Sequence, residues 1–236
     1  MKNILLLMMG GKGTRFGADI PKQYIEVNSI PIFAYILKKY SLMDEIDDII
    51  VVSHQDWISF VNQWIKTMNI GKIRDVVQGG DTRSGSVLNG LTAASKFADK
   101  DDVVLIHDAT HPYVDVEGTK KVIEGVREYG GATLAQFQYD TMYRKSDDDV
   151  LIEVVPRKEI VSGASPEAFR FGEIFKIYSE TPEEKFEIMT SAGAIALANR
   201  IKMKVIESNV VNLKITYQKD MKIFKKLALT YFFEEE

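Results

Sequence analysis

Cysteine is absent from the 236 residues of this chain. The absence excludes disulfides, cysteine ligands to zinc, iron–sulfur clusters and a cysteine nucleophile. It also fits a cytoplasmic location, because disulfides persist mainly in oxidising compartments. We therefore expect a cytoplasmic protein whose chemistry uses oxygen and nitrogen groups.

A strong excess of charge and a long apolar run are missing as well. The 30 lysines and arginines nearly balance the 34 aspartates and glutamates, which leaves a formal net charge of −4. We expect no nucleic-acid partner, and an anionic ligand would need a local cluster of cations. The apolar run Ile4–Met9 is too short to span a bilayer, so we expect neither a membrane segment nor a signal peptide.

What the sequence does contain is an alternation of short apolar runs with longer amphipathic ones. This order predicts an α/β fold, with a doubly wound, mostly parallel sheet and helices on both of its faces. The expected strands are 3–8, 48–52, 72–78, 102–107, 132–138, 203–207 and 212–215. The expected helices are 31–42, 57–68, 83–97, 116–129, 171–178, 182–189, 192–199 and 218–229.

The alternation stops between residues 140 and 165, where the sequence is polar and β-branched. This stretch cannot form a core of its own. We expect it to be a protruding β-arm within a single domain that spans residues 1–236, with Asp147–Asp149 near its tip. These three aspartates resemble the D-x-D metal motif of glycosyltransferases, but their polar surroundings favour a solvated turn.

A glycine-rich segment with two cations follows the first expected strand. It reads Met9-Gly10-Gly11-Lys12-Gly13-Thr14-Arg15-Phe16-Gly17. Glycines let several backbone N–H groups approach one ligand, and Lys12 and Arg15 add positive charge, so the segment predicts a polyphosphate site. It is one residue too long for the dinucleotide motif G-x-G-x-x-G, and it does not fit the P-loop. Lys22, in Pro21-Lys22-Gln23, can reach back towards this segment.

Together with later motifs, these segments resemble a family of cytidylyltransferases. The later motifs are Gly79-Gly80-Asp81-Thr82-Arg83-Ser84-Gly85-Ser86-Val87, His107-Asp108-Ala109, Asp140-Thr141-Met142, Arg157, Ser165-Pro166-Glu167-Ala168-Phe169 and Asn212-Leu213-Lys214-Ile215-Thr216. The family includes 2-C-methyl-D-erythritol 4-phosphate cytidylyltransferase and ribitol-5-phosphate cytidylyltransferase. The resemblance implies a Rossmann-like nucleotidyltransferase that transfers CMP from CTP to a polyol phosphate and releases pyrophosphate. It also implies Mg²⁺ as cofactor and a homodimer formed by arm exchange.

The resemblance further implies roles for individual residues. CTP would be bound by Met9, Gly10, Gly11, Lys12, Gly13, Thr14, Gly80, Arg83, Ser86 and Asp108, with Gly80 and Ser86 near the cytosine. Arg15, Lys22 and Lys214 would be the catalytic cations, and Asp108 would bind Mg²⁺. The acceptor would contact His111, Asp140, Thr141, Arg157 and Ser165, with arm residues supplied by the neighbouring subunit.

The identity of the acceptor stays open at this stage. His111 stands where the family usually carries arginine, which changes one acceptor contact. Segments 53–57, 181–185 and 212–216 resemble the ribitol-5-phosphate enzymes, and 2-C-methyl-D-erythritol 4-phosphate is the alternative acceptor. The pathway, to a cell-envelope polymer or to isoprenoid precursors, is open too. Two other classes remain, namely a glycosyltransferase that uses a nucleotide sugar and a non-catalytic nucleotide-binding protein.

Overall fold

A mostly parallel sheet forms the centre of the molecule. The computed structural model describes residues 1–11, 16–17, 20–186 and 191–233. In this part of the chain, seven strands form one sheet in the order β11-β7-β10-β6-β1-β4-β5. They are β1 (Asn3–Met9), β4 (Asp48–Ser53), β5 (Ile73–Gln78), β6 (Val103–Asp108), β7 (Gly130–Phe137), β10 (Val161–Arg170) and β11 (Lys202–Glu207). Only β10 runs antiparallel to its neighbours within this sheet, which confirms the predicted α/β fold.

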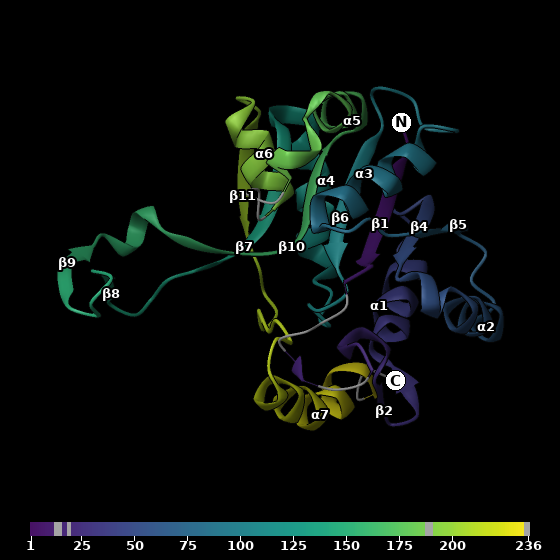
Figure 1. The fold of residues 1–236 in the computed structure, drawn as a ribbon, viewed down its shortest axis with the longest axis horizontal. Helices are drawn as coiled ribbons and strands as arrows, with labels where there is room; N and C mark the ends of the chain where they lie inside the picture. Colours follow the sequence, from purple (N-terminus) through teal and green to yellow (C-terminus); the bar gives the residue numbers. More distant parts are fainter. Residues whose placement is uncertain (12–15, 18–19, 187–190, 234–236) are drawn as a thin grey trace.

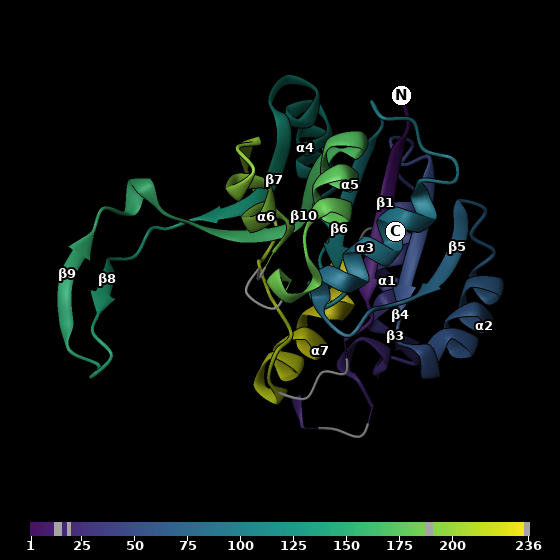
Figure 2. The same cartoon turned by 45° about the horizontal axis from the view of Figure 1, so that its top comes forward.

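Helices cover both faces of the sheet (Figures 1 and 2). One apolar cluster contains buried residues of α1 (Ile32–Ser41), α2 (Ile58–Met68), α4 (Val116–Tyr129) and α7 (Gln218–Phe233). The other contains buried residues of α3 (Arg83–Ala94), α5 (Phe171–Glu180) and α6 (Ala192–Ala198). Strand β1, apolar from Ile4 to Met9, contributes to both clusters, because successive side chains of a strand point to opposite faces. Leu5 and Leu7 belong to the first cluster, and Ile4 and Leu6 belong to the second.

Two expected elements differ in the structure. The strand expected at 212–215 is wrong, because this segment has no ladder in the described sheets and makes single contacts such as Ile215 N to Thr110 O. The helix expected at 182–189 is a short 3-10 helix at Glu183–Lys185, and residues 187–190 lie outside the described part. Lys185 N bonds to Pro182 O, three residues back, which is the tighter 3-10 pattern.

A hairpin projects away from the central sheet (Figures 1 and 2). It is a separate two-stranded sheet of β8 (Met142–Lys145) and β9 (Leu151–Val155), and its turn contains Asp147–Asp149. Apolar side chains on it are exposed, including Leu151 at 63% and Val154 at 62%. An isolated two-stranded hairpin is only marginally stable in water and needs another surface to pack against. The described part of this chain does not cover these apolar side chains.

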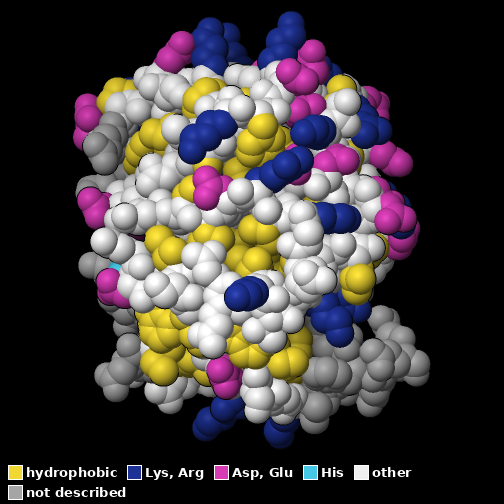
Figure 3. All heavy atoms as spheres, turned by 90° about the vertical axis from the view of Figure 1, so that its right-hand side faces the viewer, with side chains coloured by type: hydrophobic (Ala, Val, Ile, Leu, Met, Phe, Trp, Pro, Cys, Tyr) yellow, Lys and Arg dark blue, Asp and Glu magenta, His cyan; other side chains and the backbone are white. Residues whose placement is uncertain are grey.

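The opposite side of the molecule carries β5 and α2, with apolar side chains lying between charged ones (Figure 3). Val61 of α2 is fully buried, whereas Trp57, Phe60 and Trp64 are partly buried and pack against the core. Trp57 stacks on Tyr24, with ring centroids 4.6 Å apart. A smaller two-stranded sheet, β2 (Glu26–Val27) with β3 (Ile30–Pro31), precedes α1. Within the described residues, no helix has the length and apolar character needed to cross a membrane.

Candidate active site

The carboxyl ends of β1, β4, β5 and β6 meet at one edge of the sheet. Ligands of open α/β sheets bind at this edge. The parallel register of β1 and β6 places Met8 beside Asp108, the last residue of β6. The glycine-rich segment begins directly after β1. Two segments that are far apart in the sequence therefore lie side by side here.

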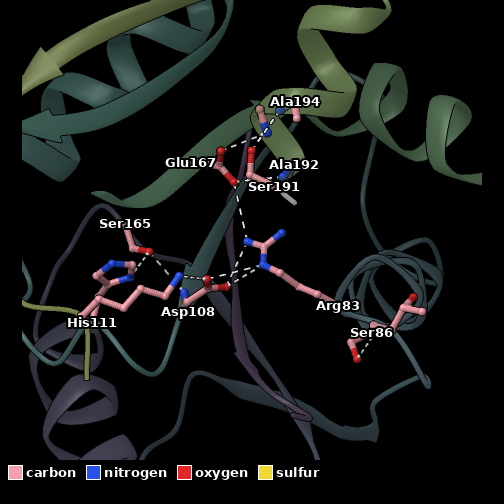
Figure 4. A network of polar contacts seen from close by, with 12 residues as sticks. Arg83, Ser86, Asp108, His111, Ser165, Glu167, Ser191, Ala192 and Ala194 are labelled. Atoms are coloured by element: carbon pink, nitrogen blue, oxygen red, sulfur yellow. Dashed lines mark hydrogen bonds and ion pairs between the residues drawn. The ribbon is translucent and has the colours of Figure 1, made fainter. Parts of the chain in front are cut away.

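Asp108 lies at the centre of a compact group of charges (Figure 4). Arg83, the first residue of α3, donates from Nε and Nη2 to Asp108 Oδ1 at 3.1 and 2.9 Å. Lys214 Nζ lies 3.6 Å from Asp108 Oδ2. Burial alone would raise the pKa of Asp108, but the charges of Arg83 and Lys214 hold it below its usual value. Asp108 is therefore ionised and gathers two cations at the end of β6.

A second, partly buried carboxylate, not assigned a role from the sequence, lies beside the Arg83 guanidinium. Glu167 of β10 pairs with Ile106 of β6, and its Oε2 is 3.6 Å from Arg83 Nη2. Its two oxygens also accept from the backbone N–H groups of Ala192 and Gly193, at 3.1 and 2.9 Å. Burial raises the pKa of Glu167 despite these partners. Its only sequence signal was its position inside the Ser165–Phe169 motif.

Two histidines and a serine complete the side of the site nearest β10. His111 Nδ1 lies 3.0 Å from Ser165 Oγ, which also accepts from Asp108 N at 3.4 Å. His107 Nε2 is 2.8 Å from His111 O, and His107 Nδ1 is 2.8 Å from the Tyr40 hydroxyl. Because a carbonyl only accepts, His107 carries its proton on Nε2 and accepts from Tyr40. Burial lowers the pKa of His107 to about 4 and that of His111 to about 3, so both rings are neutral near pH 7.

Mild acid is expected to destabilise the fold through these two rings. Both folded pKa values lie below the ordinary 6.5, so the unfolded chain binds more protons below that pH. The free energy of unfolding should fall as the pH drops from about 6.5 to about 4, by at most about 2.7 kcal/mol per pH unit for two such sites. Urea unfolding across this range measures the effect. His111→Asn should remove about half of the slope, and equal wild-type stability at pH 6.5 and pH 5 would contradict the assignment.

A second group of residues packs closely together at the same edge. Ser86 Oγ accepts from Gly80 N at 3.0 Å and donates to Thr82 O at 2.9 Å. A Cβ atom on Gly79 would lie 2.9 Å from Ser86 Oγ and 3.0 Å from Gly10 Cα. The end of β1, the loop after β5 and the start of α3 therefore meet closely around the small side chain of Ser86.

Replacing Gly80 with alanine is expected to destabilise the fold. The added Cβ would lie 2.8 Å from the backbone carbon of Gly85, which cannot move aside cheaply. Overpacking of this kind costs about 1–3 kcal/mol of unfolding free energy, which urea unfolding can measure. Gly71→Ala is the matched control, since no described heavy atom lies within 4 Å of its added Cβ. Equal stability of the two variants would refute the expectation.

The glycine-rich segment is anchored by two residues next to Lys22. Gln23 Nε2 donates to Met9 O at 2.9 Å and to Gly11 O at 2.8 Å. The Tyr24 hydroxyl also donates to Met9 O, at 2.9 Å. Lys22 itself is only 7% exposed and begins the 3-10 helix Lys22–Tyr24. Gln23 and Tyr24 were not predicted as site residues, although the motif Pro21-Lys22-Gln23 contains Gln23.

The structure gathers some of the expected site residues and separates others. Gly10, Gly80, Arg83, Ser86, Asp108, His111, Ser165 and Lys214 belong to the contacts described above. Lys12, Gly13, Thr14 and Arg15 lie outside the described residues. Asp140, Thr141 and Arg157 lie on the segment between β7 and β10 that carries the hairpin and extends from the sheet. Arg157 donates from Nη1 to Tyr139 O within that segment.

Asp108 is the residue of this site that fits a metal ion. The described part of the chain contains no group of three or more carboxylate or histidine side chains placed to hold a metal ion. Mg²⁺ usually takes one or two carboxylates together with substrate phosphates, so one aspartate fits a site that a triphosphate completes. Arg83 Nε reaches both oxygens of Asp108, at 3.1 and 3.4 Å. A bound cation would therefore have to displace Arg83 from Asp108.

The fold and the site together define a class of protein. A mostly parallel sheet carries a glycine-rich segment after its first strand, with an aspartate and several cations at the same edge. These are the parts of an α/β nucleotidyltransferase.

Within that class, the chain belongs to the 2-C-methyl-D-erythritol 4-phosphate cytidylyltransferase family, whose model matches residues 4–228. It is therefore a cytidylyltransferase, an enzyme that uses CTP, as the sequence resemblance implied. It is 34% identical to 2-C-methyl-D-erythritol 4-phosphate cytidylyltransferase of Thermotoga neapolitana, over 96% of both chains. It is 30% identical to ribitol-5-phosphate cytidylyltransferase of Streptococcus agalactiae, over 96% of this chain and 95% of that one. The crystal structure of 4-diphosphocytidyl-2C-methyl-D-erythritol synthase from Anaerococcus prevotii matches with a TM-score of 0.77 and 27% identity, over 97% of this chain and 96% of that one.

Proposed function

We propose that the chain transfers CMP from CTP to a polyol phosphate of the ribitol 5-phosphate type. An oxygen of the acceptor phosphate bonds to the α-phosphorus of CTP, and the bond from that phosphorus to the bridging oxygen breaks to release pyrophosphate. No protein nucleophile is needed, because the work is to position two anions and to balance their charge. The observation that carries the proposal is the group of Asp108, Arg83 and Lys214 beside the glycine-rich segment.

CTP would occupy the edge between the glycine-rich segment and α3. The N–H groups of residues 9–14 would bind the triphosphate, with the charges of Arg15 and Lys22 beside it. Gly80 and Ser86 would hold the cytosine, and the close backbone packing around them favours a small ring over a purine. Arg83 would stay near the phosphates.

The acceptor would lie on the side of Asp108 that faces β10. A neutral His111 bonded to Ser165 offers hydrogen bonds to hydroxyl groups rather than a charge to a phosphate. The acceptor phosphate would then depend on Lys214 and on arm residues of a second subunit, namely Asp140, Thr141 and Arg157. The likeness of segments 53–57, 181–185 and 212–216 to ribitol-5-phosphate enzymes favours ribitol 5-phosphate, with 2-C-methyl-D-erythritol 4-phosphate as the second candidate because relatives of both names match this chain.

Asp108 would hold Mg²⁺ together with oxygens of the triphosphate. When bound, the ion would supply positive charge against the phosphates. Lys214 and Arg83 lie within 4 Å of the same carboxylate, so the chain's own cations would surround the reacting groups from two sides. Their task would be to keep the two phosphorylated substrates in one place.

The working form would be a homodimer joined through the hairpins. The hairpin of β8 and β9 projects from the central sheet (Figure 1). Its exposed apolar side chains need a covering surface, and a second copy of the chain would provide one. The arm of each subunit would then reach the acceptor side of the other subunit's site. The cytoplasmic location expected from the sequence stays a prediction.

Pyrophosphate release from CTP tests the proposed function. The protein is incubated with CTP and Mg²⁺ and with ribitol 5-phosphate, 2-C-methyl-D-erythritol 4-phosphate or no acceptor. We expect release that depends on the acceptor and is fastest with ribitol 5-phosphate. Faster release with 2-C-methyl-D-erythritol 4-phosphate would establish the alternative acceptor. Binding of CTP without release for any polyol phosphate would indicate a non-catalytic protein.

A further inference from the structure

We propose, building on the function proposed above, that Glu167 is a positioning residue that receives Arg83 when Asp108 binds its metal ion. Arg83 would then have two positions, one on Asp108 and one on Glu167. The guanidinium would stay in the site in both positions, and only its carboxylate partner would change.

The geometry of Arg83 gives the first support. Its Nη2 lies 2.9 Å from Asp108 Oδ1 and 3.6 Å from Glu167 Oε2, so one nitrogen faces both carboxylates (Figure 4). Its Nη1 is buried and has no hydrogen-bond partner among the residues that the structure describes. A guanidinium has five N–H donors, and an unpaired buried donor costs free energy. Arg83 is therefore incompletely satisfied on Asp108, with a second acceptor close by.

Glu167 is held firmly enough to act as that acceptor. The N–H groups of Ala192 and Gly193, at the start of α6, both bond to its carboxylate. A Cβ atom on Gly193 would lie only 2.6 Å from Glu167 Oε1, so the close approach depends on the glycine. The first turn of α6 has no acidic residue of its own. Glu167, on strand β10, supplies the negative charge that the start of a helix favours.

The exchange also explains how Asp108 could become available. Both of its oxygens lie within hydrogen-bonding reach of Arg83, so a metal ion must compete with the guanidinium. Breaking a buried ion pair without a replacement partner is costly. With Glu167 in place, Arg83 exchanges one carboxylate for another, and the competition becomes easier for the metal ion.

The test compares Glu167→Gln with Ser191→Ala. Both variants weaken the start of α6, because Ser191 Oγ accepts from Ala194 N, but only Glu167 faces Arg83. The readout is the Mg²⁺ concentration that gives half of the thermal stabilisation produced by CTP. We expect Glu167→Gln to raise this concentration roughly tenfold, as loss of a residue that orients a metal ligand does. Ser191→Ala should lower the melting temperature but leave the Mg²⁺ requirement unchanged.

Gly193→Ala provides a second variant in case Glu167→Gln does not fold. Its Cβ would push the Glu167 carboxylate from its place while keeping the charge, so it should also raise the Mg²⁺ requirement. If Glu167→Gln and Gly193→Ala both need the same Mg²⁺ concentration as the wild-type protein, the role of Glu167 is overturned and the proposed function is not affected. CTP stabilisation that needs no Mg²⁺ in the wild-type protein would overturn the metal role of Asp108, and the exchange with it.

Discussion

Replacing Lys22 with alanine is expected to lower the turnover number for pyrophosphate release by about 100- to 1,000-fold, the usual cost of removing one group that stabilises developing charge. Lys22 is held in a buried 3-10 helix whose next residue, Gln23, anchors the glycine-rich segment. Its charge would therefore act on the triphosphate in a fixed position. Arg15→Ala should have an effect of the same order. Turnover is measured at saturating CTP and acceptor.

Lys222→Ala is the matched control for Lys22→Ala. Lys222 is exposed on α7, so its removal should leave turnover within about twofold of wild type, as for most surface substitutions. Circular dichroism and the melting temperature establish that each variant is folded. Near-normal pyrophosphate release by folded Lys22→Ala would remove Lys22 from the mechanism.

Mixing two inactive variants is expected to restore activity. Arg157 lies on the projecting segment, whereas Lys22 lies at the edge of the central sheet. If the arm completes the partner's site, a heterodimer of Arg157→Ala with Lys22→Ala has one site with both residues intact. Equal mixing with free subunit exchange should give about a quarter of the wild-type activity, because half of the dimers are mixed and each has one working site.

The control for this experiment is a pair of variants on the same body. Lys22→Ala mixed with Asp108→Asn should restore no activity, because both residues lie on the body of the subunit and each site of the heterodimer keeps one damaged residue. A chain that carries both Arg157→Ala and Lys22→Ala, mixed equally with wild type, distinguishes a shared site from a site made within one subunit. A site made within one subunit would keep half of the activity. Confirmed heterodimers of the two single variants without recovered activity would rule out a shared site.

The central sheet could be predicted from sequence because its strands carry their own signal. The run of apolar residues in β1 and the alternation around it are local features, and helix α4 begins and ends where the pattern predicted. Strand β10 was not foreseen, because Val161–Arg170 mixes small and polar residues and its ladder needs β6 and β7. The strand expected at 212–215 failed for the opposite reason, since its suitable local pattern pairs with no strand of the described sheets.

The candidate site shows the same division between local and distant signals. The glycine-rich segment and Asp108 could be picked out because each lies at the carboxyl end of a strand. Glu167 could not, because its importance comes from Arg83 and Gly193, which the fold brings to it from distant parts of the sequence. The arm residues are a third case, since a single chain leaves them away from Asp108 and only a second subunit could bring them near.

Strand β1 belongs to both apolar clusters, so the stability of one face of the sheet depends on that of the other. Neither layer of helices can separate without exposing side chains of a strand on which the other layer also packs. The layers should therefore unfold together as one cooperative unit. The backbone amides of Leu5, Leu6 and Leu7 would then exchange with solvent only through global unfolding. The glycine-rich segment would therefore be attached to a strand that opens only when the whole sheet unfolds.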